Sequence, residues 1–168
     1  MLIILSDFRG VAKRGEAQEV AKRTRDELLS LVVCGRSLEE WDAVWEEVRG
    51  GFAADHSQLV DVPGLARALL DGEVKYILRA TEKRGLQKGL QRIRGKPQTG
   101  NKGFGAQMIR RHIDVLDLEI LRFPASKGSV DCIKTLKSRM IELHQPEWDG
   151  ARQKRLAALQ IGKLGKSR

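Results

Sequence analysis

The sequence predicts a mainly helical, single-domain protein, a bundle of about six to seven helices with a short N-terminal strand as an optional addition. Through most of the 168 residues, apolar side chains recur at steps of three and four, which is the spacing of a buried helix face. Strand candidates are short and confined to 2–5, 31–34 and 59–62, and the second of these competes with a helical stripe. The alternative is an α/β fold.

Two helices are predicted in the first third of the chain. Apolar and small residues share one face from Glu16 to Val33, and Gly35 ends that segment. The second helix begins at Ser37, whose side chain can accept the amide three residues on while Glu40 reaches back to the cap. This helix runs to Gly50–Gly51, which stops it.

The middle of the chain predicts a short helix, a turn and a broken helix. Pro63 suits the first turn of a helix through Leu70, and Asp71–Gly72 marks a turn. From residue 73 to 94 the apolar positions follow helical spacing, but those of the second half point roughly 120° away from those of the first. A break at Gly85 brings both halves onto one core face.

The last third predicts a loop followed by helices. Residues 95–105 contain four Gly and one Pro, and they form the clearest loop of the protein. A regular apolar stripe from Ile109 to Phe123 predicts a helix that Pro124 ends. Ser129 can cap the next helix.

Charge divides the chain into two unlike halves. Residues 1–74 carry 9 Lys/Arg against 14 Asp/Glu, whereas residues 75–168 carry 22 against 8. This asymmetry indicates a polyanionic partner for the second half. We therefore divide the chain into a helical domain, 1–148, with an acidic part, 1–72, and a basic part, 73–148, followed by a basic C-terminal helix and tail, 149–168.

The basic part contains the predicted nucleic-acid interface. From Lys83 to Arg111 there are nine cations and no acid, and the Gly-rich loop 95–105 adds free backbone amides. Phosphate oxygens need this combination of charge and adaptable donors. The predicted nucleic-acid-binding residues are Lys75, Arg79, Lys83, Arg84, Lys88, Arg92, Arg94, Lys96, Lys102, Arg110 and Arg111.

The scarcity of aromatic residues favours double-helical over single-stranded nucleic acid. Aromatic residues make up 5% of the chain, and in the basic half Tyr76 and Phe123 fit core faces. Phe104, between two glycines, is the one ring that the sequence presents to solvent. Single-stranded binders stack bases on several exposed rings. We therefore expect contacts to the phosphate backbone of duplex DNA or structured RNA, with no catalytic residue, metal or cofactor assigned.

Two other functions are compatible with the sequence. Asp114, Asp117 and Glu119 are close enough to suggest a metal-dependent enzyme acting on nucleic acid, of the nuclease or recombinase type. The chain is also compatible with a structural component of a nucleoprotein assembly. Trp41 and Trp45 lie one helical turn apart among acidic residues, which fits either core packing or a surface for a protein partner or self-association, and they are the predicted partner-binding residues of the acidic half.

Cysteine usage and hydropathy predict an intracellular location. Cys34 and Cys132 lack metal-ligand or redox-motif spacing, so we expect free thiols in a reducing cytoplasm, with a single disulfide as the alternative. No stretch approaches 18 apolar residues, and we expect no membrane association.

Overall fold

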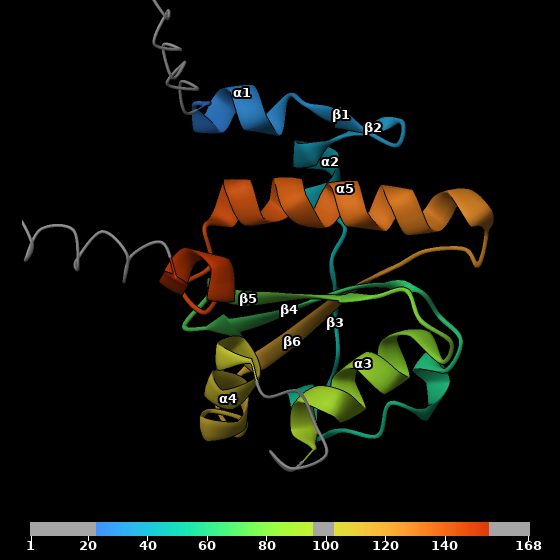
Figure 1. Cartoon of the computed structure of the whole chain (residues 1–168), viewed down its shortest axis with the longest axis vertical. Helices are drawn as coiled ribbons and strands as arrows, with labels where there is room; N and C mark the ends of the chain where they lie inside the picture. Colours follow the sequence, from blue (N-terminus) through green and yellow to red (C-terminus); the bar gives the residue numbers. More distant parts are fainter. Residues whose placement is uncertain (1–22, 96–102, 155–168) are drawn as a thin grey trace, which may run out of the picture.

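The fold is built on a four-stranded antiparallel sheet that helices cover on both faces (Figure 1). The computed structural model describes residues 23–95 and 103–154. The strands lie in the order β3-β6-β4-β5, and each neighbouring pair is antiparallel. These strands are β3 (Glu46–Glu47), β4 (Gly64–Leu70), β5 (Glu73–Ala80) and β6 (Asp117–Arg122).

Helices α3 and α4 pack on one face of the sheet, and α5 crosses the other face (Figure 1). An N-terminal layer of α1, the β1–β2 hairpin and α2 lies on the outer side of α5 (Figure 1). The bounds of these elements are α1 (Arg25–Leu29), β1 (Val32–Val33), β2 (Arg36–Ser37), α2 (Leu38–Asp42), α3 (Gly85–Arg94), α4 (Phe104–Arg111) and α5 (Lys127–His144), with short 3₁₀ helices at Gly51–Ala53 and Ser57–Leu59.

The two central strands are buried on both faces, so the protein has two apolar cores. Ala66 of β4 and Ile120 of β6 are register partners and face α3 and α4. Leu65 and Leu121, the next pair along, face α5 and the N-terminal layer. Successive strand residues therefore contribute to opposite cores.

The predicted helical bundle is wrong, because four segments form a sheet and give the protein an α/β fold. The predicted helix from Pro63 to Leu70 is β4, and the first half of the predicted helix 73–94 is β5. A strand buried on both faces is a nearly continuous apolar run without alternation. Such a run can be fitted by helical spacing, which explains the error.

Three other predicted helices are partly wrong. The helix predicted over 109–123 divides into the end of α4 and β6. The helix predicted from Ser37 ends at Asp42, and Glu46–Glu47 pair with β6. The helix predicted over 16–33 is α1 followed by β1, and its residues 16–22 lie outside the described part of the chain.

Local signals in the sequence are more reliable than periodicity, although the cap predicted at Ser129 is wrong, because α5 begins at Lys127 with Ser126 at its N-cap. The capping box at Ser37 is confirmed, with Ser37 N donating to Glu40 Oε2 at 2.7 Å and Glu40 N donating to Ser37 Oγ at 3.2 Å. The turn at Asp71–Gly72 is confirmed, although it joins two strands, with φ of 52° and 77° at the two residues. Two positive φ values match the type I′ hairpin turn. Gly85 begins α3, as the predicted break requires.

A disulfide between Cys34 and Cys132 ties the β1–β2 turn to α5, with the two Cα atoms 6.0 Å apart. The predicted free thiols are therefore wrong, and the alternative of a single disulfide is what the structure has. The bond joins the N-terminal layer to the first turns of α5. Among residues 23–95 and 103–154, no helix has the length and apolar character needed to span a bilayer.

Removal of this disulfide is expected to destabilise the protein. The linked cysteines are 98 positions apart, and closing a loop of about 100 residues is worth up to about 4.7 kcal/mol in the chain-entropy account. A Cys34→Ser/Cys132→Ser variant should unfold at lower urea concentration than the oxidised wild type, and reductant should not change its midpoint. Two titratable thiols in the untreated, denatured protein would contradict the bond. Equal urea midpoints for the variant and the oxidised wild type would contradict its effect on stability.

Gly85 is expected to tolerate alanine less well than Gly72. Both have positive φ, 50° and 77°, and alanine in that region costs about 1–2 kcal/mol. A Cβ at Gly85 would also lie 2.1 Å from the Val62 carbonyl oxygen, whereas nothing lies within 4 Å at Gly72. Urea unfolding should therefore show a larger loss in the free energy of unfolding for Gly85→Ala than for Gly72→Ala. Equal losses would contradict the close approach of α3 to Val62.

Candidate nucleic-acid interface

Two shallow grooves meet at the end of β5, and Glu82 lines both of them. The first, of about 410 Å³, lies between the start of α3 and the start of α5, and the second, of about 150 Å³, lies between β5 and α3. Because the grooves share Glu82, the cations that line them form one continuous surface, here called the Glu82 surface. These cations are Lys83, Arg84 and Lys127 in the first groove and Lys88 and Arg92 in the second. Predicted residue Arg79 also lines the second groove, but as the register partner of Leu65 its side chain faces α5 on the other side of the sheet.

The apolar stripe of α3 directs its cations outward. Leu86, Leu90 and Ile93 are at most 1% exposed and pack on the sheet. Positions 88 and 92 are one turn apart on another face of the helix. Lys88 and Arg92 therefore keep 39% and 53% of their side chains exposed.

A single carboxylate holds two of these cations. Arg92 Nη1 lies 2.9 Å from Glu82 Oε1 and 2.8 Å from Glu82 Oε2, and Lys88 Nζ lies 3.4 Å from Glu82 Oε2. The hydrogen bonds and charge of Arg92, and then those of Lys88, hold the pKa of Glu82 below its ordinary value. Glu82 is therefore ionised at neutral pH and lowers the net charge of the surface by one.

Arg84 is fixed by its position before α3. Its backbone has a φ of 71°, and its N–H donates to Asp61 Oδ1 at 3.2 Å. Its Nη2 donates to Gln87 Oε1 at 2.7 Å, which leaves the charge of the guanidinium without a carboxylate within 4 Å among the described residues.

Several predicted nucleic-acid-binding residues lie elsewhere. Arg94 Nη1 donates to the Ala54 carbonyl at 3.0 Å, and Arg110 Nη1 donates to the Ile93 carbonyl at 2.8 Å. Arg111 is exposed at the end of α4 and lines neither groove. Predicted residues Lys96 and Lys102 lie outside the described residues.

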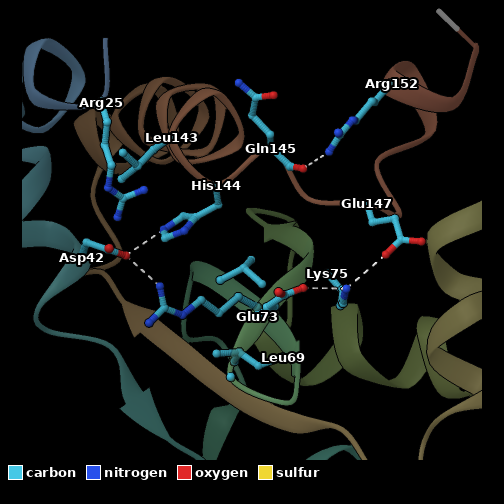
Figure 2. A pocket seen from close by; sticks show the side chains of 13 residues that line it. Arg25, Asp42, Leu69, Glu73, Lys75, Leu143, His144, Gln145, Glu147 and Arg152 are labelled. Atoms are coloured by element: carbon cyan, nitrogen blue, oxygen red, sulfur yellow. Dashed lines mark hydrogen bonds and ion pairs between the residues drawn. The ribbon is translucent and has the colours of Figure 1, made fainter. Parts of the chain in front are cut away.

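Lys75 lies in a separate polar cavity of about 770 Å³, at the C-terminal end of α5 (Figure 2). Its Nζ is 2.9 Å from Glu73 Oε2 and 3.0 Å from Glu147 Oε2. The hydrogen bonds that Lys75 donates to these two carboxylates, to Glu73 first, raise the pKa of Lys75. Since two acids already neutralise it, Lys75 contributes no net positive charge toward a polyanion.

A network around Arg67 occupies the other end of this cavity (Figure 2). Arg67 Nε lies 2.5 Å from Glu119 Oε2, and Arg67 Nη1 lies 2.7 Å from Asp42 Oδ1. His144 Nε2 is 2.8 Å from the same Asp42 oxygen, and the Arg67 guanidinium lies 4.4 Å from the Trp45 ring centroid. The network joins α2, β4, β6 and α5, and its charges compensate one another. We therefore assign it a structural role.

The two tryptophans predicted to bind a partner contact the fold itself. Trp41 Nε1 donates to the Val33 carbonyl at 2.8 Å, and its ring stacks on Phe123 at 5.2 Å between centroids. Trp45 lies beneath Arg67. Both rings therefore pack within the fold, although the buried Trp45 Nε1 has no hydrogen-bond partner among the described residues. Partner binding by these tryptophans remains a prediction.

The acidic residues proposed as a metal site have other contacts or positions. Glu119 binds Arg67, and His112 stacks on Trp148 at 5.5 Å between centroids. Asp114 lies in the loop before β6, and Asp117 begins that strand. Within residues 23–95 and 103–154, no three His, Cys, Asp or Glu side chains are grouped as a metal site would need.

Sequence analysis did not identify Lys127 as a nucleic-acid-binding residue, because only the fold brings it to the Glu82 surface. It stands 16 positions after Arg111, beyond the acid-free window, at the first position of α5.

Comparisons with protein-family models, curated proteins and solved structures found no match.

Asp42 is expected to make stability depend on acid pH. Burial acts to raise its pKa, but the hydrogen bond and charge of His144, together with Arg67, lower it below the ordinary value of 3.8. A lowered folded-state pKa gives stability that is present above the unfolded value and is lost as the pH falls through the folded one. Asp42→Asn should be less stable at pH 7 and should lose less stability between about pH 4 and pH 2.

The measurement is urea unfolding at several pH values, with Asp131→Asn, at an exposed position of α5, as the control. If wild type and Asp42→Asn show the same acid dependence while the control behaves as wild type, the ion-pair network does not hold Asp42 as described.

Proposed function

We propose that the chain binds the phosphate backbone of double-helical nucleic acid, duplex DNA or structured RNA, through the Glu82 surface. The observation that carries this proposal is that two adjoining grooves share Glu82 and bring together cations from α3, α5 and the loop between β5 and α3. Five cations line this surface against two carboxylates, Glu82 and Asp61. A polyanion would release counterions on binding there.

The side chains of the surface suit a backbone rather than bases. Among the described residues, no aromatic side chain lines either groove. Phe104 is 41% exposed, but it begins α4 and lies outside both grooves. Binding through charge without stacking should show little base preference and steep salt dependence, with a slope of log K against log salt of up to about −4.5 on duplex DNA if all five cations bind phosphates.

The alternative functions have less support from the described residues. A metal-dependent enzyme would need Asp114, Asp117 and Glu119 to converge, and Glu119 is instead bound to Arg67. A nucleoprotein component with a partner on the acidic half remains a proposal, and poor solubility with co-purifying nucleic acid would favour it. The predicted reducing, cytoplasmic location also remains a prediction, and the Cys34–Cys132 disulfide counts against it.

Charge reversal on the surface tests the proposal. Lys83→Glu/Arg92→Glu should weaken binding of a duplex DNA and of a structured RNA, at every sequence alike. It should also reduce the magnitude of the salt slope by about one per cation. Fluorescence anisotropy over a range of salt concentrations measures both quantities.

Arg36→Glu/Arg49→Glu is the matched control, since it makes the same change in net charge at exposed positions of β2 and the segment after β3. Affinity should fall far less in this variant. Equal losses in the two variants would show a dependence on net charge alone and would remove the Glu82 surface from the proposal. Binding confined to only one of the two nucleic acids would name the partner.

A further inference from the structure

The volume and the lining residues of the groove between β5 and α3 fit one phosphate group. Its volume is about 150 Å³, and the cations of its lining that pair with Glu82 are Lys88 and Arg92. A water molecule takes about 30 Å³ in the liquid, so the groove has room for a tetrahedral oxyanion. Gly85 and Gly89 also line the groove.

In the free protein, the carboxylate of Glu82 is the anion that pairs with Arg92 and Lys88. Both carboxylate oxygens lie within 3 Å of Arg92 Nη1, and one of them lies 3.4 Å from Lys88 Nζ. Carboxylate and phosphate are the two anions whose oxygens a guanidinium binds most readily, through the same charge-assisted hydrogen bonds. The carboxylate therefore shows where anionic oxygens are stable in this groove.

Glu82 can leave the groove without disturbing either apolar core. It lies in the loop between β5 and α3, and 57% of its side chain is exposed. Gly89 lets the helix lie close to the strand, since a Cβ there would lie 3.2 Å from Ala80 Cβ and from Leu78 Cδ2. Exchange of Glu82 for a phosphate needs only rotation of one surface side chain.

We propose that the groove between β5 and α3 is a subsite for one phosphate group, and that Glu82 occupies its cations until a phosphate displaces the carboxylate. The inference rests on the proposed function for its source, a phosphate of the nucleic-acid backbone, but the subsite can be tested with phosphate alone. Glu82 is then a competitor within the chain that lowers affinity and speeds release.

The test uses Glu82→Gln, which removes the competing charge and keeps the shape of the side chain. An exposed ion pair is weak, so the variant should bind a duplex about two- to fivefold more tightly than wild type. Glu73→Gln is the control, because Glu73 is another exposed glutamate paired with a lysine, and it lies in the other cavity. An equal gain in the control would show a net-charge effect and overturn the inference.

A double-mutant cycle with Arg92→Gln distinguishes competition between Glu82 and phosphate for Arg92 from a general effect of net charge. If Glu82 acts through Arg92, Glu82→Gln should give a smaller gain in the Arg92→Gln background than in wild type. Identical gains in both backgrounds would contradict a shared phosphate subsite. Thermal unfolding of all variants checks that each remains folded.

Inorganic phosphate makes the subsite and the proposed function separable. Titration should shift the amide NMR resonances of Gly85 and Gly89, at lower phosphate concentration in Glu82→Gln than in wild type. If phosphate shifts them but no duplex binds, the subsite stands and the nucleic-acid function fails. If the duplex binds through Lys83 and Arg92 but phosphate leaves these amides unchanged in both proteins, the function stands and the subsite fails.

Discussion

The geometry of the Glu82 surface depends on one close approach, that of α3 to the chain just before β4. Leu86 N donates to the Val62 carbonyl at 2.8 Å, and Phe123 N donates to the Pro63 carbonyl at 2.9 Å. Helix α3, the start of β4 and the end of β6 therefore meet at two successive carbonyls. Gly85 makes this possible, because any side chain there would occupy the space of the Val62 backbone. With α3 seated in this way, its apolar stripe lies on the sheet and its cations face solvent.

The cations of the basic half have three different uses, which net charge alone cannot distinguish. Arg94 and Arg110 donate to main-chain carbonyls and stabilise the contacts between α3, α4 and the segment that joins the two 3₁₀ helices. Lys75 is neutralised by two glutamates. The cations that remain for a partner lie where main-chain carbonyls already have main-chain hydrogen-bond partners and where few acidic side chains are near. The proposed Glu82 surface therefore consists of cations that do not hold helices and strands together.

Sequence reasoning identified features set by a few neighbouring residues and missed those set by the sheet. The capping box of Ser37, the turn at Asp71–Gly72 and the break at Gly85 each depend on local chemistry, and each is present. Strand β4 is buried on two faces by partners distant in the chain, so its apolar residues show no strand alternation. Strand β6 alternates only from Asp117 to Ile120, which is too short to stand out from the helical stripe that runs through it. The same limit applies to the site, where Lys127 reaches the surface only because α5 begins beside α3.

Sheet order turns the charge asymmetry of the sequence into an asymmetry in space. The order β3-β6-β4-β5 places the acidic pair Glu46–Glu47 at one edge of the sheet and β5, beside α3, at the other. Of these acids, Glu46 is held 3.1 Å from Arg122, so part of the acidic edge is neutralised within the fold. A polyanion approaching this molecule would meet attraction at the β5 edge and weak repulsion at the β3 edge. That difference would orient the ligand toward the Glu82 surface before any contact forms, which a scattered set of the same cations could not do.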